Sequence, residues 1–121
     1  MKSFHLEHRA DGPVDIFRIE GELGTESAYT LEAALLEQMR NGRYCFVVNA
    51  RKLEQITSTG LGMFMARIEE IRTHHGDIKF CHLRSRVYHV FDLLGYPSFF
   101  EILDKEDEAI QRFLNGGDDH A

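Results

Sequence analysis

The chain of 121 residues fits a single domain, and its content of 43% hydrophobic and 28% charged residues is typical of a globular protein. Its formal net charge of −6 disfavours nucleic acid or an anionic membrane as the main partner, because both attract clustered Lys and Arg. No apolar run approaches the roughly 20 residues of a membrane span, and residues 1–7 lack the apolar core of a secretory leader, so we expect a cytoplasmic protein without membrane insertion.

Two short strands are expected at the start of the chain. Apolar and polar residues alternate over residues 3–8, and residues 14–20 form a second strand-like run. The turn signal Asp11-Gly12-Pro13 lies between them, which predicts a hairpin. Residues 21–24 contain two glycines and are expected to end the second strand.

Helices and strands alternate over the middle of the chain. Thr25 or Ser27 can cap a helix that ends at Asn41-Gly42, where glycine suits a left-handed C-terminal cap. Residues 44–48 are apolar on both parities, which predicts a central strand covered on both faces. A long amphipathic helix then follows residues 57–59 and ends near residues 74–76.

The last third of the chain predicts two more strands, at residues 77–83 and 99–103, and two more helices. Ser85 and Asp104 are the expected caps of these helices, and residues 115–121 are expected to fray. The side chains expected to point inward are Val87, Val90, Phe91 and Leu94 in the first of these helices and Ile110, Phe113 and Leu114 in the second.

This order of elements predicts a single α/β domain over residues 1–121. Alternating strands and helices favour a largely parallel sheet, and the N-terminal hairpin adds an antiparallel edge. The expected architecture is therefore a small mixed β-sheet flanked by about four helices.

The sequence contains few signs of catalysis or metal binding. Cys45 and Cys81 lie in apolar runs and are interpreted as buried, reduced thiols. The adjacent His74 and His75 favour a helix C-terminus, since no ligand-spacing motif frames them. Phosphate loop, dinucleotide fingerprint and nucleophile elbow are all absent, so no catalytic residue, metal or cofactor is predicted, and an enzyme or nucleotide-binding protein ranks last.

The run Thr57-Ser58-Thr59 is the main candidate site. One hydroxyl is enough to cap the following helix, so three hydroxyls leave capping and a modified or binding site both open. At about 100° per residue, Thr59 lies on the helix side opposite the apolar stripe, together with Ala66 and Glu70. Met63 is expected on the same side, as an apolar residue exposed to water.

Several segments, in this order and spacing, resemble a STAS domain of the anti-sigma-factor antagonist type. The resemblance covers nearly the whole chain, and Gly24, Asn49 and Thr57 stand where the family often has Asp. The segments that carry it are Ile19-Glu20-Gly21-Glu22-Leu23, the apolar strand before the hydroxyls, Ser58-Thr59-Gly60-Leu61-Gly62, the helix Phe91-Asp92-Leu93-Leu94-Gly95, the strand Phe100-Glu101-Ile102 and the helix Glu108-Ala109-Ile110.

The resemblance implies a non-enzymatic regulator that binds a kinase-type anti-sigma factor. The kinase would phosphorylate Thr59, or Ser58 as the fallback, and a PP2C-type phosphatase would reverse the modification. The partner-binding residues expected from the motif and the helix spacing are Thr57, Ser58, Thr59, Gly60, Met63, Ala66, Arg67 and Glu70. The alternative is an accessory STAS subunit of a lipid-transport ABC complex, which would dock through the same helix face without phosphorylation.

Overall fold

The computed structural model describes residues 3–116, and in this part of the chain five strands form one sheet in the order β1-β2-β3-β4-β5. β1 (Phe4–Asp11) pairs antiparallel with β2 (Val14–Leu23). β3 (Cys45–Ile56), β4 (Asp77–Cys81) and β5 (Glu101–Leu103) continue the sheet in parallel. The mixed α/β sheet predicted from the sequence, with its antiparallel hairpin edge, is confirmed.

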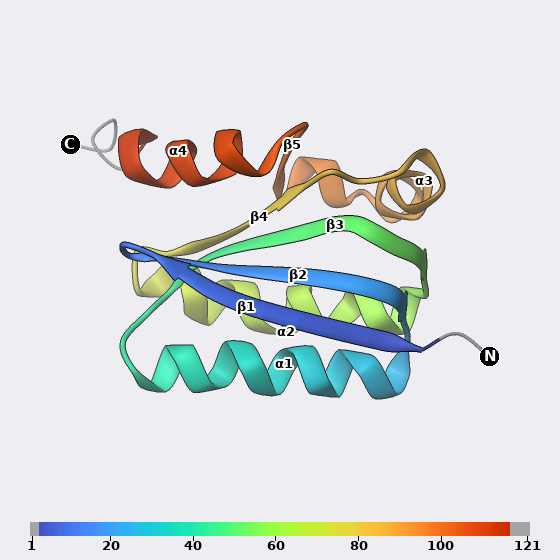
Figure 1. Ribbon diagram of the computed structural model, residues 1–121, viewed down its shortest axis with the longest axis horizontal. Coiled ribbons are helices and arrows are strands. Elements are labelled where there is room, and N and C mark those ends of the chain that lie inside the picture. Colours follow the sequence, from blue (N-terminus) through green and yellow to red (C-terminus); the bar gives the residue numbers. More distant parts are fainter. Residues whose placement is uncertain (1–2, 117–121) are drawn as a thin grey trace.

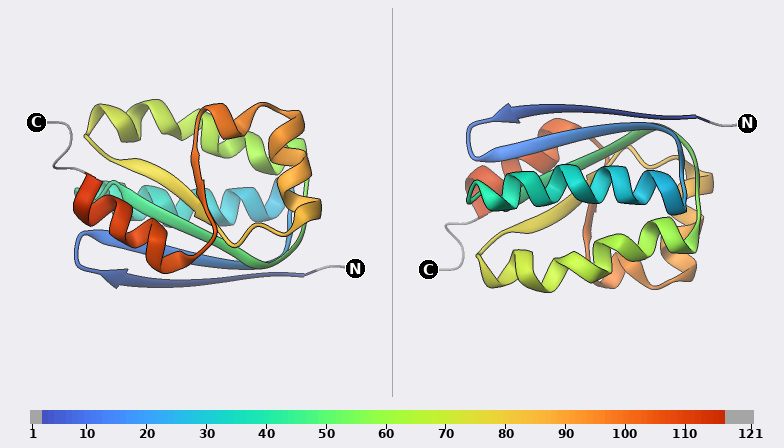
Figure 2. Two further views of the ribbon diagram at one scale, coloured as in Figure 1. Left: turned by 90° about the horizontal axis from the view of Figure 1, so that it is seen from above. Right: turned by 90° about the horizontal axis from the view of Figure 1, so that it is seen from below.

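Helices cover both faces of this sheet (Figures 1 and 2). α1 (Thr25–Arg40) and α2 (Ser58–Thr73) lie side by side on one face, and α4 (Glu106–Gly116) lies on the other. α3 (Ser85–Leu93) and the short 3₁₀ helix η1 (Tyr96–Ser98) lie toward the end of the sheet where β3 finishes. β3 is thus the covered central strand that its apolar sequence predicts.

The main hydrophobic core lies between the sheet and α1, α2 and α3. The ring of Phe80 in β4 is at its centre, with the rings of Phe64 and Phe91 each 4.9 Å away and that of Phe100 at 5.4 Å, all nearly perpendicular to it. Such edge-to-face pairs contribute beyond the area they bury. A smaller cluster under α4 consists of Val14, Ile16, Val47, Cys81, Ala109 and Ile110.

Two strands extend further than the sequence predicts. β2 continues to Leu23 through Gly21, which has a positive φ of 97°, and the pairing with β3 shifts register next to this glycine. β3 runs to Ile56 instead of ending at Val48. Its second half alternates irregularly between buried and exposed residues, which is why the apolar pattern ends before the strand does.

The capping predictions for α1 were wrong at its start and right at its end. Gly24 is the N-cap, and Ser27 assists from within the helix by accepting the Gly24 N–H at 2.8 Å; Thr25 is the first helical residue. At the other end Asn41 is the C-cap and Gly42 has a φ of 78°, the left-handed conformation expected there.

The prediction for the start of α4 was also wrong. The helix begins two residues after Asp104, and the Glu106 N–H donates to His82 Nε2 at 3.1 Å. Leu94 and Leu114, expected inside, are 45% and 42% exposed. α4 includes residues 115 and 116, where fraying was expected, and the rest of the expected tail, residues 117–121, lies outside the described part of the chain.

Glu106 anchors α4 to the sheet through charge-assisted hydrogen bonds. Arg18 donates to both carboxylate oxygens, at 3.0 and 2.8 Å, and Arg9 adds a third bond at 3.0 Å. Asn49 in β3 donates to the same carboxylate at 2.9 Å. The hydrogen bonds from Arg18, helped by those from Asn49 and Arg9, outweigh desolvation and lower the pKa of Glu106 from 4.5 to about 2. Glu106 therefore does more than compensate the dipole of α4, because it also ties the helix to the sheet.

This anchor makes the domain sensitive to acid. Because the folded-state pKa of Glu106 lies below its ordinary value, the stabilisation is complete above about pH 4.5 and is lost as the pH falls toward about 2. We expect Glu106→Gln to lower the free energy of unfolding at pH 7 by about 2 kcal/mol, the order of a hydrogen bond to a charged group. The variant should also lose less stability than wild type between about pH 6 and pH 3.

Urea unfolding at both pH values measures this difference, with Asp107→Asn as the control, because Asp107 is the exposed carboxylate next to Glu106 in the same helix turn. Identical pH profiles for wild type and Glu106→Gln would contradict the assignment.

Candidate functional site

Thr57 joins β3 to α2 and is the N-cap of that helix. Its side-chain Oγ1 accepts the N–H of Gly60 at 2.9 Å, and its backbone N–H donates to the Leu23 carbonyl at 3.0 Å. Capping and a binding or modified site were both open for the three hydroxyls. The structure gives the capping role to Thr57 alone.

Gly60 allows the first turn of α2 to lie against the end of β2. A Cβ at this position would lie 2.3 Å from the Leu23 carbonyl oxygen, whereas a Cβ on Gly62 would meet nothing within 4 Å. Gly60 is buried. It therefore serves the packing of the turn and is not part of the exposed surface expected for the partner-binding residues.

Ser58 and Thr59 are the first two residues of α2, and both are exposed. Within the described chain neither hydroxyl has a hydrogen-bond partner, and the first turn of α2 contains no acidic residue. The free N–H groups and the positive end of the helix dipole favour an anionic group at such a position. The turn can thus carry a phosphate on either hydroxyl without loss of an existing contact.

Met63 does not lie where the helix spacing placed it. It is 7% exposed and belongs to the main core, while Met65 is 36% exposed. The prediction assumed one buried stripe along α2, but α1 packs beside this helix and covers a second side of it. Met63 is therefore a core residue, and Met65 is the methionine at the surface of α2.

The other predicted residues of α2 are at its surface. Ala66 and Glu70 are exposed. Arg67 is partly buried, and its Nε donates to Glu32 Oε2 at 2.7 Å, which ties α2 to α1. We call the exposed residues on this side of the helix the outer α2 face; they are Ser58, Thr59, Met65, Ala66, Glu69 and Glu70. Helical spacing could have found Met65 and Glu69 only if the position of α1 had been known.

Asn49 stands at one of the positions where the sequence resemblance leads us to expect Asp, and its contacts account for the amide. Asn49 donates to Glu106 and accepts the N–H of Arg51 at 2.9 Å. An aspartate here would place a second carboxylate against Glu106, whereas the amide donates to it. Asn49 thus belongs to the α4 anchor, on the opposite face of the sheet from the outer α2 face, and no sequence motif indicates this pairing.

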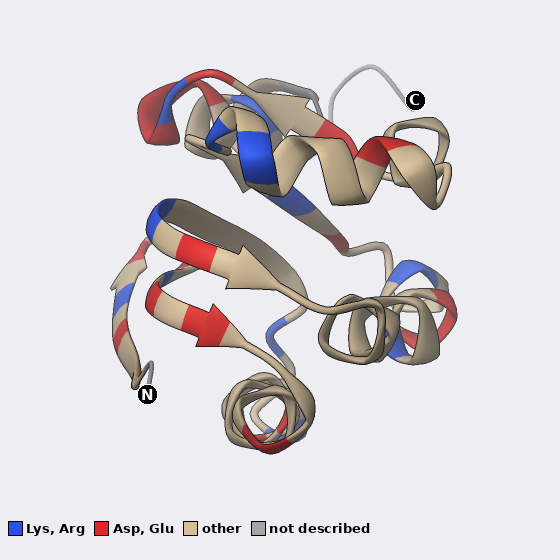
Figure 3. Cartoon of the chain, turned by 90° about the vertical axis from the view of Figure 1, so that its right-hand side faces the viewer, with Lys and Arg blue, Asp and Glu red and all other residues tan. Residues whose placement is uncertain are grey.

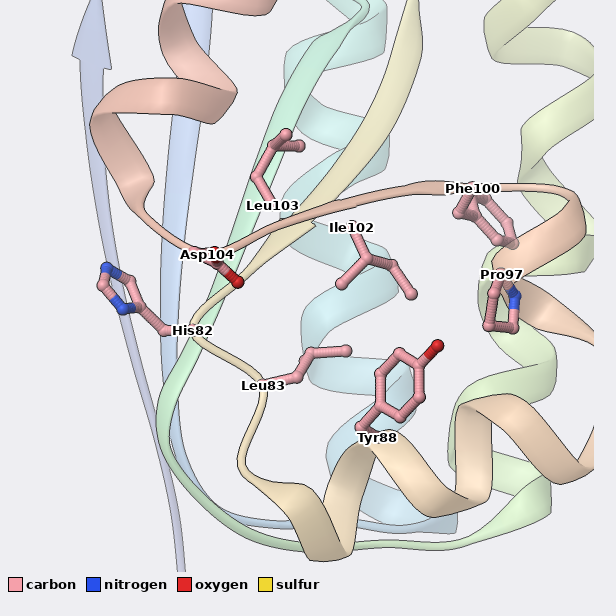
Figure 4. A pocket seen from close by; sticks show the side chains of 8 residues that line it. All are labelled: His82, Leu83, Tyr88, Pro97, Phe100, Ile102, Leu103 and Asp104. Atoms are coloured by element: carbon pink, nitrogen blue, oxygen red, sulfur yellow. The ribbon is translucent and has the colours of Figure 1, made fainter.

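A pocket of about 320 Å³ lies between α3, η1 and β5 (Figure 4). Leu83, Tyr88 and Ile102 converge on its centre, and Asp104 lies at its rim. His82 points away from them, toward its hydrogen bond with the backbone of Glu106. Within the pocket drawn, nucleophile and base side chains do not converge.

Charge is mixed over the domain. In Figure 3 acidic and basic segments occur together on both strands and helices. No group of three His, Cys, Asp or Glu side chains suited to a metal ion occurs within residues 3–116. In the same part of the chain, none of the helices has the length and apolar character needed to cross a membrane.

These features define a small α/β domain whose distinctive element is an exposed pair of hydroxyls at a helix N-terminus. The model of the STAS domain family matches residues 5–109, and the chain belongs to this family.

Named relatives are similar over most of their length. The anti-sigma-B factor antagonist of Bacillus subtilis is 28% identical over 96 residues, which cover 77% of this chain and 84% of the relative. The protein of the same name from Listeria monocytogenes is 25% identical over 107 residues, which cover 88% and 92%.

The fold is shared with solved structures of another antagonist. The anti-sigma factor antagonist SpoIIAA in its unphosphorylated form has a TM-score of 0.77 at 23% identity, covering 92% of this chain and 96% of that chain. Bacillus SpoIIAA in its phosphorylated form has a TM-score of 0.69 at 22% identity, covering 92% and 99%.

The different roles of the hydroxyls can be tested by stability. Thr57→Ala removes the acceptor for the Gly60 N–H and should lower the free energy of unfolding by about 1 kcal/mol. Thr59→Ala removes a hydroxyl without a partner and should change stability by less than about 0.5 kcal/mol. Chemical denaturation of both variants and wild type provides the comparison. Equal losses in the two variants would contradict the assignment of the cap to Thr57.

Proposed function

We propose that the chain is an antagonist of a kinase-type anti-sigma factor, controlled by reversible phosphorylation of Thr59. The relatives named above carry the antagonist name, which supports the general role. The observation that carries the proposal is that the hydroxyls of the turn have different roles. Thr57 caps the helix, whereas Thr59 is exposed and its hydroxyl has no hydrogen-bond partner within the described chain. The protein acts as the substrate of its partner and has no catalysis of its own.

Thr59 is preferred to Ser58 because of where a phosphate would lie. Thr59 and Ala66 are seven residues apart, close to two full helical turns, so they share one side of α2. Ser58 is turned by about 100° from this line, toward the side of Met65. A phosphate on Thr59 thus lies beneath Ala66 and Glu70, within the outer α2 face. The motif resemblance selects the same residue.

The phosphate acts on the partner rather than on the fold. It adds about −1.5 to −2 charges at a position where the helix N-terminus tolerates an anion. On the outer α2 face the same charge must be desolvated when a partner docks, and it adds to the charges of Glu69 and Glu70. The partner is thereby released, and a PP2C-type phosphatase restores binding. This cycle belongs to the cytoplasm, where such regulators meet their kinases.

Intact-mass measurement tests the modification. The purified chain is incubated with ATP and a kinase-type anti-sigma factor, taken from a neighbouring gene where one is encoded there. We expect a gain of one phosphate in wild type and in Ser58→Ala, and none in Thr59→Ala, because Thr59 is the residue that the motif selects and lies in line with Ala66 and Glu70. Loss of the phosphate in Ser58→Ala with retention in Thr59→Ala would move the site to the fallback residue. Binding of the regulator without any phosphate gain would contradict the proposed switch.

The position of the partner surface can be tested separately. Ala66→Glu places a charge at the centre of the outer α2 face and should weaken binding of the same kinase-type partner at least tenfold, roughly the cost of one desolvated charge. Ala33→Glu is the matched control, because Ala33 is an exposed alanine on α1 and should leave affinity unchanged. Calorimetric titration gives both affinities, and wild-type binding by Ala66→Glu would show that the face is misplaced.

A further inference from the structure

The outer edge of β1 is open along its whole length. Figure 2 shows this strand at one margin of the molecule, and no described element lies beyond it. Its pairing with β2 is regular from Phe4 to Asp11, without a bulge or a proline. An edge strand of this kind offers a row of unpaired backbone groups to another strand.

The hairpin fixes which residues direct their backbone groups outward. Asp11 pairs with Val14 across the turn, and the Glu22 N–H donates to the Ser3 carbonyl at 3.2 Å. Since hydrogen-bonded and non-hydrogen-bonded pairs alternate in an antiparallel ladder, the odd-numbered residues of β1 bond to β2. The remaining residues direct their N–H and C=O groups to the open edge; they are Phe4, Leu6, His8 and Ala10.

We propose that this edge pairs antiparallel with the same edge of a second copy of the chain, about a twofold axis at His8. A twofold axis normal to the sheet leaves the α4 faces of both copies on the same side. Such an axis must pass midway between the two copies of one β1 residue. When the axis lies at His8, Glu7 lies opposite Arg9 of the second copy, and His5 lies opposite Asp11 of the second copy. Centred on Glu7, the two Glu7 carboxylates would face each other. Charge complementarity therefore selects the His8 register.

Arg9 already donates to Glu106 at 3.0 Å, and its side chain is 46% exposed, so it would meet Glu7 of the second copy in addition to that bond. Figure 3 shows acidic and basic bands alternating along the strand, as the order of Glu7, Arg9 and Asp11 requires. The His8 ring is held over its own sheet, stacked on Phe17 at 4.8 Å and bonded to Asp15 at 2.8 Å, so it leaves the edge free.

On the face that carries the His8 ring, Leu6 would meet Ala10 of the second copy. α2 lies at the opposite margin of the molecule in Figure 2, so the dimer keeps both outer α2 faces accessible.

Sedimentation equilibrium of the full chain over a range from about 1 µM to 1 mM tests the proposal. We expect the mass to rise with concentration from 14.0 kDa to twice that value. Glu7→Lys converts both Glu7–Arg9 pairs to like charges and should raise the dimer dissociation constant at least tenfold, about the sum of two reversed cross-strand pairs. Glu20→Lys is the control, because it makes the same change on β2, away from the edge.

Two further measurements separate edge pairing from a loss of folding. Ala10→Pro removes an outward N–H and should abolish the dimer while circular dichroism stays native. A mixture of Glu7→Lys and Arg9→Glu should recover the dimer, because each chain then offers the opposite charge to the other; circular dichroism must first show Arg9→Glu to be folded, since Arg9 also donates to Glu106. A wild-type chain that remains at 14.0 kDa throughout would overturn the proposal. A dimer that Glu7→Lys and Ala10→Pro leave unchanged would place the interface elsewhere and overturn it equally.

Discussion

The close approach of α2 to the end of β2 is the constraint on which the site depends. The Leu23 carbonyl accepts the Thr57 N–H, and its oxygen lies where a side chain on Gly60 would have to be. Only glycine allows this contact, and the contact fixes the direction in which the helix leaves the sheet. Once Thr57 is held in this way it caps the helix, and the two hydroxyls that follow must point to solvent. The exposure of Ser58 and Thr59 is thus a consequence of the backbone contacts that Thr57 and Gly60 make with Leu23.

A second constraint separates the charges of the domain. The most strongly bound carboxylate, Glu106, is neutralised by Arg18 and Arg9 on the α4 face of the sheet. Asn49 completes that cluster without adding a charge. On the other face, Thr57 supplies the cap as a neutral hydroxyl, so the first turn of α2 has no carboxylate. A phosphate arriving on that turn would meet backbone donors without a like charge in the same turn. The neutral side chains of Asn49 and Thr57 therefore leave less like-charge repulsion at each place than carboxylates would.

The sequence predicts the helices and strands of this domain better than it predicts which of them pack against one another. The hairpin, the parallel order and the helix after the hydroxyls follow from periodicity and turn signals, which are local. Met63 shows the limit: its burial depends on α1, more than twenty residues earlier in the chain. Glu106 shows the same limit, because its partners come from β1, β2 and β3. The sequence predicts the hydroxyl turn because its signal lies within three consecutive residues. Only the structure shows which of the three hydroxyls caps the helix.

Under the proposed function, the arrangement would let the domain change partners without changing shape. Thr59 sits on a helix whose buried side is fixed by Leu61 and Phe64, both fully buried, and whose flank is tied to α1 by Arg67. A charge added at its N-terminus has no apolar contact to disrupt and no capping bond to break. A phosphate on Thr59 would therefore leave the fold unchanged, and its electrostatic effect would remain at the surface. The proposed switch would then require only that the partner bury the same turn that the kinase would modify.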